Sequence, residues 1–163
     1  MNPIQLFVDQ LNQNHEMLMG TLGDFSDADV LVRPCPGANN VAWQLGHLIK
    51  SEAGALAGFA PGAAPTLPAG FADKITKETA GKDDPNFFPK KAELLDLFGK
   101  VRSATIAWAK GLKEADLAQS APERMRGWAP TAGHWLGAVT GHVAMHVGQF
   151  QVIRRKLGKP VLF

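Results

Sequence analysis

Helical periodicity recurs four times along this chain and most constrains what it can fold into. In each segment the apolar residues follow one another at steps of three and four, which places them on one face of an α-helix. No segment alternates with period two, so no β-sheet is expected. The four stripes lie within residues 4–22, 41–56, 94–112 and 135–157. They predict an all-α protein, a four-helix bundle.

Local signals set the expected ends of these helices. Asn2 followed by Pro3 combines an N-cap residue with a proline in the first turn. The second helix is expected over about residues 40–58, and it is apolar on most of its sides. The fourth helix begins after Thr131 and stops at Gly158, which a proline follows closely.

A long connection separates the second helix from the third, which is expected to begin near Pro89. Residues 59–88 are rich in proline and glycine, with a short helix possible at residues 69–76. About 30 residues can span a helix that is roughly 29 Å long. The connection therefore allows the second and third helices to run parallel, as a crossover that closes one end of the bundle. With 163 residues, the chain is expected to form a single domain over residues 1–163.

Composition excludes several classes of function. The formal net charge is only +2, and the basic residues are scattered, which argues against a nucleic-acid partner. The two long uncharged stretches contain prolines or histidines and glutamines, so no membrane span is expected. A single cysteine, Cys35, excludes an internal disulfide, and the first thirty residues show no secretory signal. These features predict a cytoplasmic protein.

Two histidines on the last helix carry the clearest chemical signal. His142 and His146 are four residues apart, so both side chains project from one face and can chelate one metal ion. They also lie on the apolar stripe, where an imidazole needs a partner. The alternative is a pair of core histidines satisfied by hydrogen bonds. No glutamate follows His142, so the zinc-protease helix motif is absent.

A metal site needs a third ligand, and the sequence offers three candidates. His134 lies about 80° around the helix and 12 Å along it from His142, so it cannot reach the same ion. It is expected near the helix start or in solvent. His15 lies on the apolar stripe of the first helix and is a fair candidate by periodicity. His47 lies opposite the main stripe of the second helix, so periodicity does not favour it.

Two motifs resemble the DinB-like family. Residues 33–49 read RPCPGANNVAWQLGHLI, similar to the start of that family's second helix. Residues 141–149 (GHVAMHVGQ), followed by residues 154–160 (RRKLGKP), are similar to its last helix. The order of the motifs, the four helices and the long middle connection extend the resemblance over the whole chain.

The resemblance implies a four-helix bundle with a divalent metal, zinc or nickel, held by His47, His142 and His146. On this view His15 has a core or supporting role. Three neutral imidazoles leave a position open on the ion, as in catalytic sites. Several relatives use such a site to activate low-molecular-weight thiols, which implies a metal-dependent thiol S-transferase or hydrolase acting on a small electrophile. The rival hypothesis is a non-catalytic metal-binding or stress-associated interaction module.

Three further features have open roles. Glu52 follows His47 by a little more than one turn; it is either a partner of the site or, more simply, a solvated helix residue. Cys35 lies in a turn between prolines and has no evident role. Small residues, Gly133, Gly137, Gly141, Ala144 and Gly148, form a ridge along the last helix. Such a ridge allows close approach of another helix, from the same bundle or from a second subunit. The resemblance to the DinB-like family, whose members are often dimeric, implies a homodimer.

Overall fold

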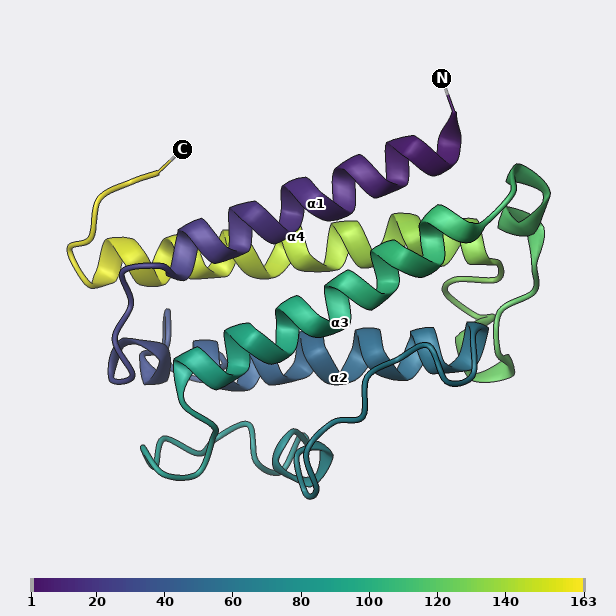
Figure 1. The fold of residues 1–163 in the computed structure, drawn as a ribbon. Coiled ribbons are helices and arrows are strands. Elements are labelled where there is room, and N and C mark those ends of the chain that lie inside the picture. Colours follow the sequence, from purple (N-terminus) through teal and green to yellow (C-terminus); the bar gives the residue numbers. More distant parts are fainter. Residues whose placement is uncertain (1, 163) are drawn as a thin grey trace.

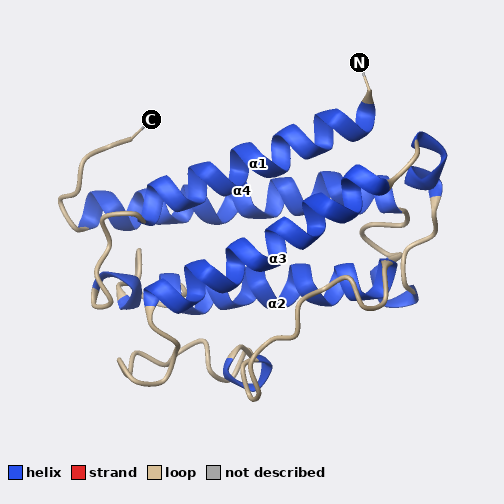
Figure 2. Cartoon of the chain, in the orientation of Figure 1, coloured by secondary structure: helices blue, strands red, loops and turns tan. Residues whose placement is uncertain are grey.

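The computed structural model describes residues 2–162 and shows four long helices (Figures 1 and 2). All of them were predicted, each end to within two residues. Short 3-10 helices lie between them, η1 to η4, at Asp29–Leu31, Ala72–Lys74, Glu114–Ala118 and Glu123–Met125. Within the described residues no strand forms, and the only β-bridge joins Ser120 to Thr131. The four helices are α1 (Pro3–Leu22), α2 (Val41–Phe59), α3 (Lys91–Gly111) and α4 (Ala132–Lys156).

Capping residues begin three of these helices, and the expected cap at Asn2 is confirmed. The Asn2 side chain accepts a hydrogen bond from the backbone N–H of Ile4, and the Asn40 side chain accepts one from Trp43. The Thr131 hydroxyl caps α4 in the same way. These contacts satisfy N–H groups that have no partner inside the helix, and they fix where each helix starts.

The helices form two parallel pairs. Helix α1 packs against α4 and α3, whereas α2 packs against α3 and, less closely, α4. In Figure 1 α1 and α4 run in one direction, and α2 and α3 run in the other. Helices α2 and α3 therefore take the parallel course that the length of the connection allows. The looser contact between α2 and α4 leaves room between these two helices, and the candidate site lies there.

The sequence suggested that the crossover closes one end of the bundle, but the structure shows otherwise. The crossover runs back along the side of α2 (Figure 1) and is fastened there by side chains of that helix. The Trp43 indole N–H donates to the Thr76 carbonyl over 2.9 Å, and Lys50 donates to the carbonyls of Ala72 and Ile75. The expected short helix within it is η2. The connection thus covers the face of α2 that points away from the core.

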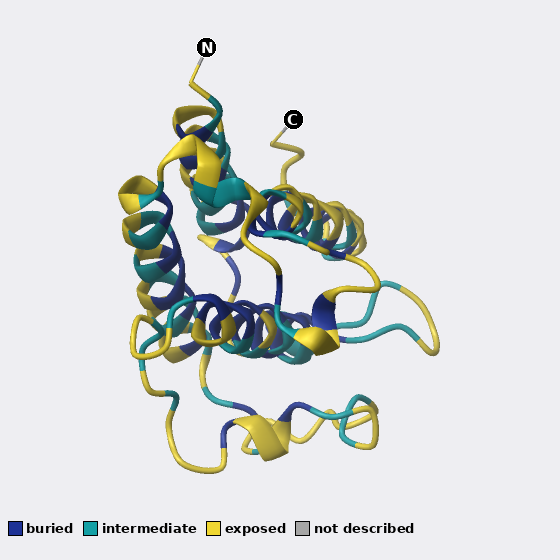
Figure 3. Ribbon diagram, turned by 90° about the vertical axis from the view of Figure 1, so that its right-hand side faces the viewer, coloured by how far each residue is buried: buried dark blue, intermediate teal, exposed yellow. Residues whose placement is uncertain are grey.

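Buried residues line the inner sides of all four helices (Figure 3). The predicted stripes supply them, since every apolar stripe residue of α1 and α2 is buried. His15 and His142 are only half-buried on their stripes. Within residues 2–162 no helix combines the length and the apolar character needed to cross a bilayer. The predicted core residues of α2 are Val41, Leu45, Leu48, Ile49 and Leu56.

Gly46 allows the crossover to pack on α2, and its replacement tests that contact. A methyl group at Gly46 would overlap the side chain of buried Ile75. One at Gly54 would make an ordinary contact with Arg124 at 3.5 Å. We expect Gly46→Ala to lower the free energy of unfolding by about 1–2 kcal/mol, because overpacking outweighs the gain in helix propensity. Gly54→Ala should be neutral or stabilising. Urea denaturation measures the stability of both variants. Equal stability would show that Ile75 does not pack closely against α2 at Gly46.

Candidate metal centre

Three histidine side chains from two helices converge between α2 and α4. His142 and His146 come from adjacent turns of α4, and His47 comes from the first half of α2. The Nε2 atom of His142 lies 3.1 Å from Nε2 of His47 and 3.2 Å from Nε2 of His146. A ligand nitrogen of each histidine lies within 4.8 Å of those of the other two. Tetrahedral zinc with Zn–N bonds near 2.0–2.1 Å separates its nitrogens by about 3.3 Å, so the cluster has the size of a metal site.

A glutamine on α2 fixes the orientation of the buried His146 ring. The amide nitrogen of Gln44 donates to the carbonyl of Asn39 over 2.7 Å, which directs the amide oxygen toward α4. His146 Nδ1 lies 2.6 Å from that oxygen and therefore carries the proton. The Nε2 atom then keeps its lone pair and points into the cluster. This arrangement is the usual way in which a protein presents an imidazole to a metal ion.

His47 is oriented by Trp43, a residue of the same helix that the crossover holds in place. Its ring stacks on the indole of Trp43, with centroids 5.4 Å apart and planes 2° from parallel. The bond from Trp43 to the Thr76 carbonyl in turn fixes that indole. A histidine opposite the core stripe of α2 is thus half-buried and ordered, because the connection covers this side of the helix.

The surroundings keep all three rings neutral. Burial and the neighbouring His47 lower the pKa of His142 to about 4. Burial, together with His142 and His47, lowers the pKa of His146 to about 3. Burial and then the Lys50 ammonium lower the pKa of His47. Near pH 7 each ring therefore offers a lone pair, which metal binding requires.

The other two candidate ligands lie outside the cluster. His134 is exposed at the start of α4, where its Nδ1 lies 2.8 Å from the Thr131 hydroxyl. This confirms the position predicted for it. His15 lies beside Phe98 on α3, with ring centroids 5.8 Å apart, and its Nε2 is buried without a hydrogen-bond partner. The geometry therefore selects His47 as the third member of the cluster.

Glu52 is not the solvated residue that the simpler hypothesis described. It is only 2% exposed, and its Oε2 accepts a hydrogen bond from Arg102 on α3 over 2.8 Å. Arg102 is fully buried, so the two residues form an ion pair inside the bundle. Burial raises the pKa of Glu52, and the Arg102 guanidinium opposes that shift. Cys35 is exposed and takes no part in the cluster.

Two cavities border the histidines. The apolar pocket, about 410 Å³, lies against His142 and is lined by aromatic and aliphatic side chains, with Glu52 on its wall. The cationic pocket, about 460 Å³, lies against His47 and is lined by Lys50, Lys77 and Arg124. Trp128 and Ser51 line both, so the two pockets are neighbours. The apolar walls of the first pocket are Trp128, Trp135, Ala138, Val139 and Met145.

Fold and cluster together define a four-helix bundle with a three-histidine site. The chain belongs to the DinB superfamily, whose sequence profile matches residues 10–150. This confirms the resemblance found in the two motifs. Among curated proteins, none matches this sequence closely enough to count as a relative.

Two solved structures have the same fold. A conserved protein from Enterococcus faecalis is 20% identical, with a TM-score of 0.69 over 98% of this chain and 99% of that one. YfiT from Bacillus subtilis is 15% identical, with a TM-score of 0.70 over 96% of this chain and 89% of that one. YfiT is described as a probable metal-dependent hydrolase with an unusual four-helix bundle topology.

Sequence reasoning missed two residues of the site. Gln44 lies between Val41 and Leu48 at helical spacing, and an amide on an apolar stripe one turn before a histidine is a detectable signal. Trp128 lies in the segment between α3 and α4, where no periodic pattern predicts which helices it covers. Its place between the pockets emerges only from the folded chain.

Proposed function

We propose that this protein binds a divalent metal ion through His47, His142 and His146 and acts as a metal-dependent enzyme. The observation that carries the proposal is the convergence of three neutral imidazoles at metal-ligand spacing. Gln44 supports it by directing the His146 lone pair into the cluster. Nitrogen ligands of this kind suit zinc or nickel.

The reaction that fits best is attack by a low-molecular-weight thiol, or by water, on a small electrophile. A divalent ion held by three histidines keeps an open position, where it lowers the pKa of a bound thiol or water near neutrality. The histidines would hold and orient the nucleophile at the junction of the two pockets. The apolar pocket offers a mainly apolar space of small-molecule size for the electrophile. The description of YfiT supports the variant in which water is the nucleophile.

Elemental analysis of the purified protein is the first test, with His47→Ala as the control that lacks one ligand. We expect one divalent ion per chain in the wild-type protein and none in the variant. A screen of thiols and water against activated electrophiles then follows on the metal-loaded protein. Turnover with a thiol supports the transferase, and turnover in water alone supports the hydrolase. Metal without any turnover would favour the non-catalytic module, and absence of metal would contradict the proposal.

A homodimer formed through the small-residue ridge of α4 remains a proposal. Among the described residues the ridge is covered only at its start, where a methyl group at Gly133 would lie 3.3 Å from the Leu117 carbonyl of η3; at Gly141 or Gly148 it would meet nothing within 4 Å. At Gly137 it would meet only Phe7, at 3.9 Å. The ridge from Gly137 onward is therefore available to a second subunit, and small residues allow backbones to approach closely.

Gly137→Leu tests that surface. The single chain has room for the larger side chain, so we expect the variant to fold and to shift from dimer toward monomer. Light scattering gives the mass, and thermal melting reports whether the fold is intact. Gly20→Leu, at an exposed position of α1 with open space around it, is the matched control. A wild-type mass for Gly137→Leu would exclude the ridge as the interface.

A further inference from the structure

The cationic pocket has positive side chains on its walls, and Glu78, the acidic residue next to Lys77, lies outside the lining. Lys50, Lys77 and Arg124 line the pocket, and no aspartate or glutamate does. Among residues 2–162, no carboxylate oxygen lies within 4.0 Å of these three cationic groups. Since the whole chain has a net charge of only +2, this is a local excess next to the histidines.

Two of these cations are fastened in place by backbone carbonyls. Lys50 is half-buried and donates to Ala72 and Ile75 over 2.9 and 2.8 Å, which uses two of its three N–H bonds. Arg124 donates one N–H to the Gly54 carbonyl and keeps its other donors. Lys50 and Gly54 are four residues apart on α2, so both cations lie along one side of that helix. Both residues line the same cavity, and each keeps at least one N–H that no described protein group accepts.

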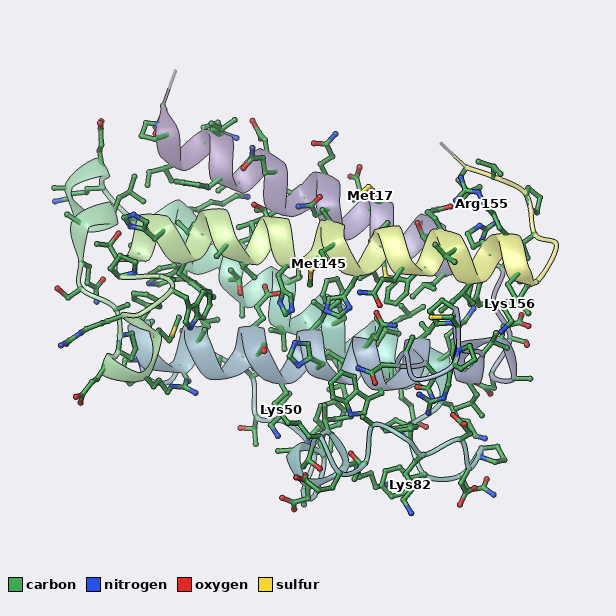
Figure 4. All side chains as sticks on the ribbon, turned by 180° about the vertical axis from the view of Figure 1, so that it is seen from behind. Met17, Lys50, Lys82, Met145, Arg155 and Lys156 are labelled. Carbon is green, nitrogen blue, oxygen red and sulfur yellow. The ribbon has the colours of Figure 1, made fainter. Side chains whose placement is uncertain are left out.

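The apolar pocket, unlike the cationic pocket, has walls that are mainly apolar side chains. Trp128 is 61% exposed and Met145 is 56% exposed, so both keep large apolar surfaces uncovered. In Figure 4 Met145 lies on α4 at the side toward α2, whereas Lys50 extends from α2 toward the crossover. The histidine cluster borders both pockets, through His142 on one side and His47 on the other.

We propose that the substrate is an amphiphilic small molecule with an oxyanion group, carboxylate or phosphate, at one end and an apolar group at the other. Lys50 and Arg124 bind the oxyanion in the cationic pocket, and Trp128 and Met145 cover the apolar end. The reacting bond between the ends then lies over the histidine cluster. This inference rests on the proposed function for the place of the reaction, and it adds the substrate class.

Binding to the metal-free protein tests this proposal apart from activity. The probes are 4-phenylbutyrate, its neutral amide 4-phenylbutyramide, and 3-phenylpropyl phosphate, with dissociation constants from calorimetry. We expect at least one of the two acids to bind more tightly than the amide. Which acid binds better identifies the oxyanion.

Three variants and one control assign the two ends of the probe. Arg124→Gln should weaken binding of the acid by roughly fivefold and leave the amide unchanged, as for a partly exposed charge. Trp128→Ala should weaken acid and amide alike. Arg126→Gln is the matched control, because Arg126 also donates to a backbone carbonyl, that of Ala121, but does not line the pocket. Lys50→Gln gives an independent second test of the charge.

Equal affinity of acids and amide, or no effect of Arg124→Gln and Lys50→Gln on the acid, would overturn the proposal. So would a Trp128→Ala variant that binds both probes as well as the wild type. Metal content is measured separately. A protein without metal that still distinguishes acid from amide through Arg124 would contradict the proposed function and keep this inference.

Discussion

Replacing His142 or His146 with alanine will abolish stoichiometric metal binding and leave the four helices folded. Two remaining imidazoles bind a divalent ion far more weakly, because a three-ligand site has no other side chain to replace the missing one. The fold persists because its core is made by the apolar stripes and does not depend on the ion. Elemental analysis measures the first effect, and far-UV circular dichroism with thermal melting measures the second.

The same experiment on His47 and His15 tests the third ligand. His47→Ala should lose the ion like the two α4 variants, since its Nε2 lies 3.1 Å from that of His142. His15→Ala should retain it, because His15 packs beside Phe98 on α3. Loss of metal in His15→Ala together with retention in His47→Ala would contradict the assignment.

Breaking the buried ion pair of Glu52 and Arg102 should be the most destabilising change in the bundle. Either Glu52→Leu or Arg102→Met leaves a charge inside the protein without a partner, which costs about 3–5 kcal/mol of unfolding free energy. The double variant removes both charges and should lie within about 1–2 kcal/mol of the wild type. Urea denaturation at pH 7 measures all three.

An exposed ion pair on α3, the helix that carries Arg102, is the control. Lys100 and Asp96 lie 2.6 Å apart with side chains 61% and 59% exposed, so Lys100→Ala should cost less than about 1 kcal/mol. A double variant as unstable as the single ones would show that packing, and not the unpaired charge, causes the loss.

The pH dependence of Arg102→Met follows from Glu52. Burial raises the pKa of this carboxyl above its ordinary value of 4.5, and removing the guanidinium that opposes the shift raises the pKa further. A raised pKa in the folded state means that stability is present below pH 4.5 and is lost as the pH rises through the folded pKa. The deficit of Arg102→Met against the wild type should therefore shrink as the pH falls from 7 toward 4.5. A deficit that does not change with pH would contradict this.

Local sequence alone determined the helices and one half of the site. Capping residues such as Asn40 and Thr131 act on N–H groups two or three positions away, so the helix starts could be read directly from the chain. The neighbouring positions of His142 and His146 follow from helix geometry in the same way. The burial of Glu52 also follows from local sequence, because it lies seven residues after Leu45 on the apolar stripe.

Only the tertiary structure decided the other half of the site, the position of His47. Periodicity marks the side of a helix that faces the core, but it does not say what covers the opposite side. Residues 60–90 cover that side of α2, so His47 is ordered there although it lies off the stripe. The partner of Glu52 likewise depends on α2 and α3 lying parallel and adjacent, which places Arg102 opposite it. Contacts of this kind join residues about 50 to 100 positions apart, and the local backbone rules that set helix spacing do not extend that far.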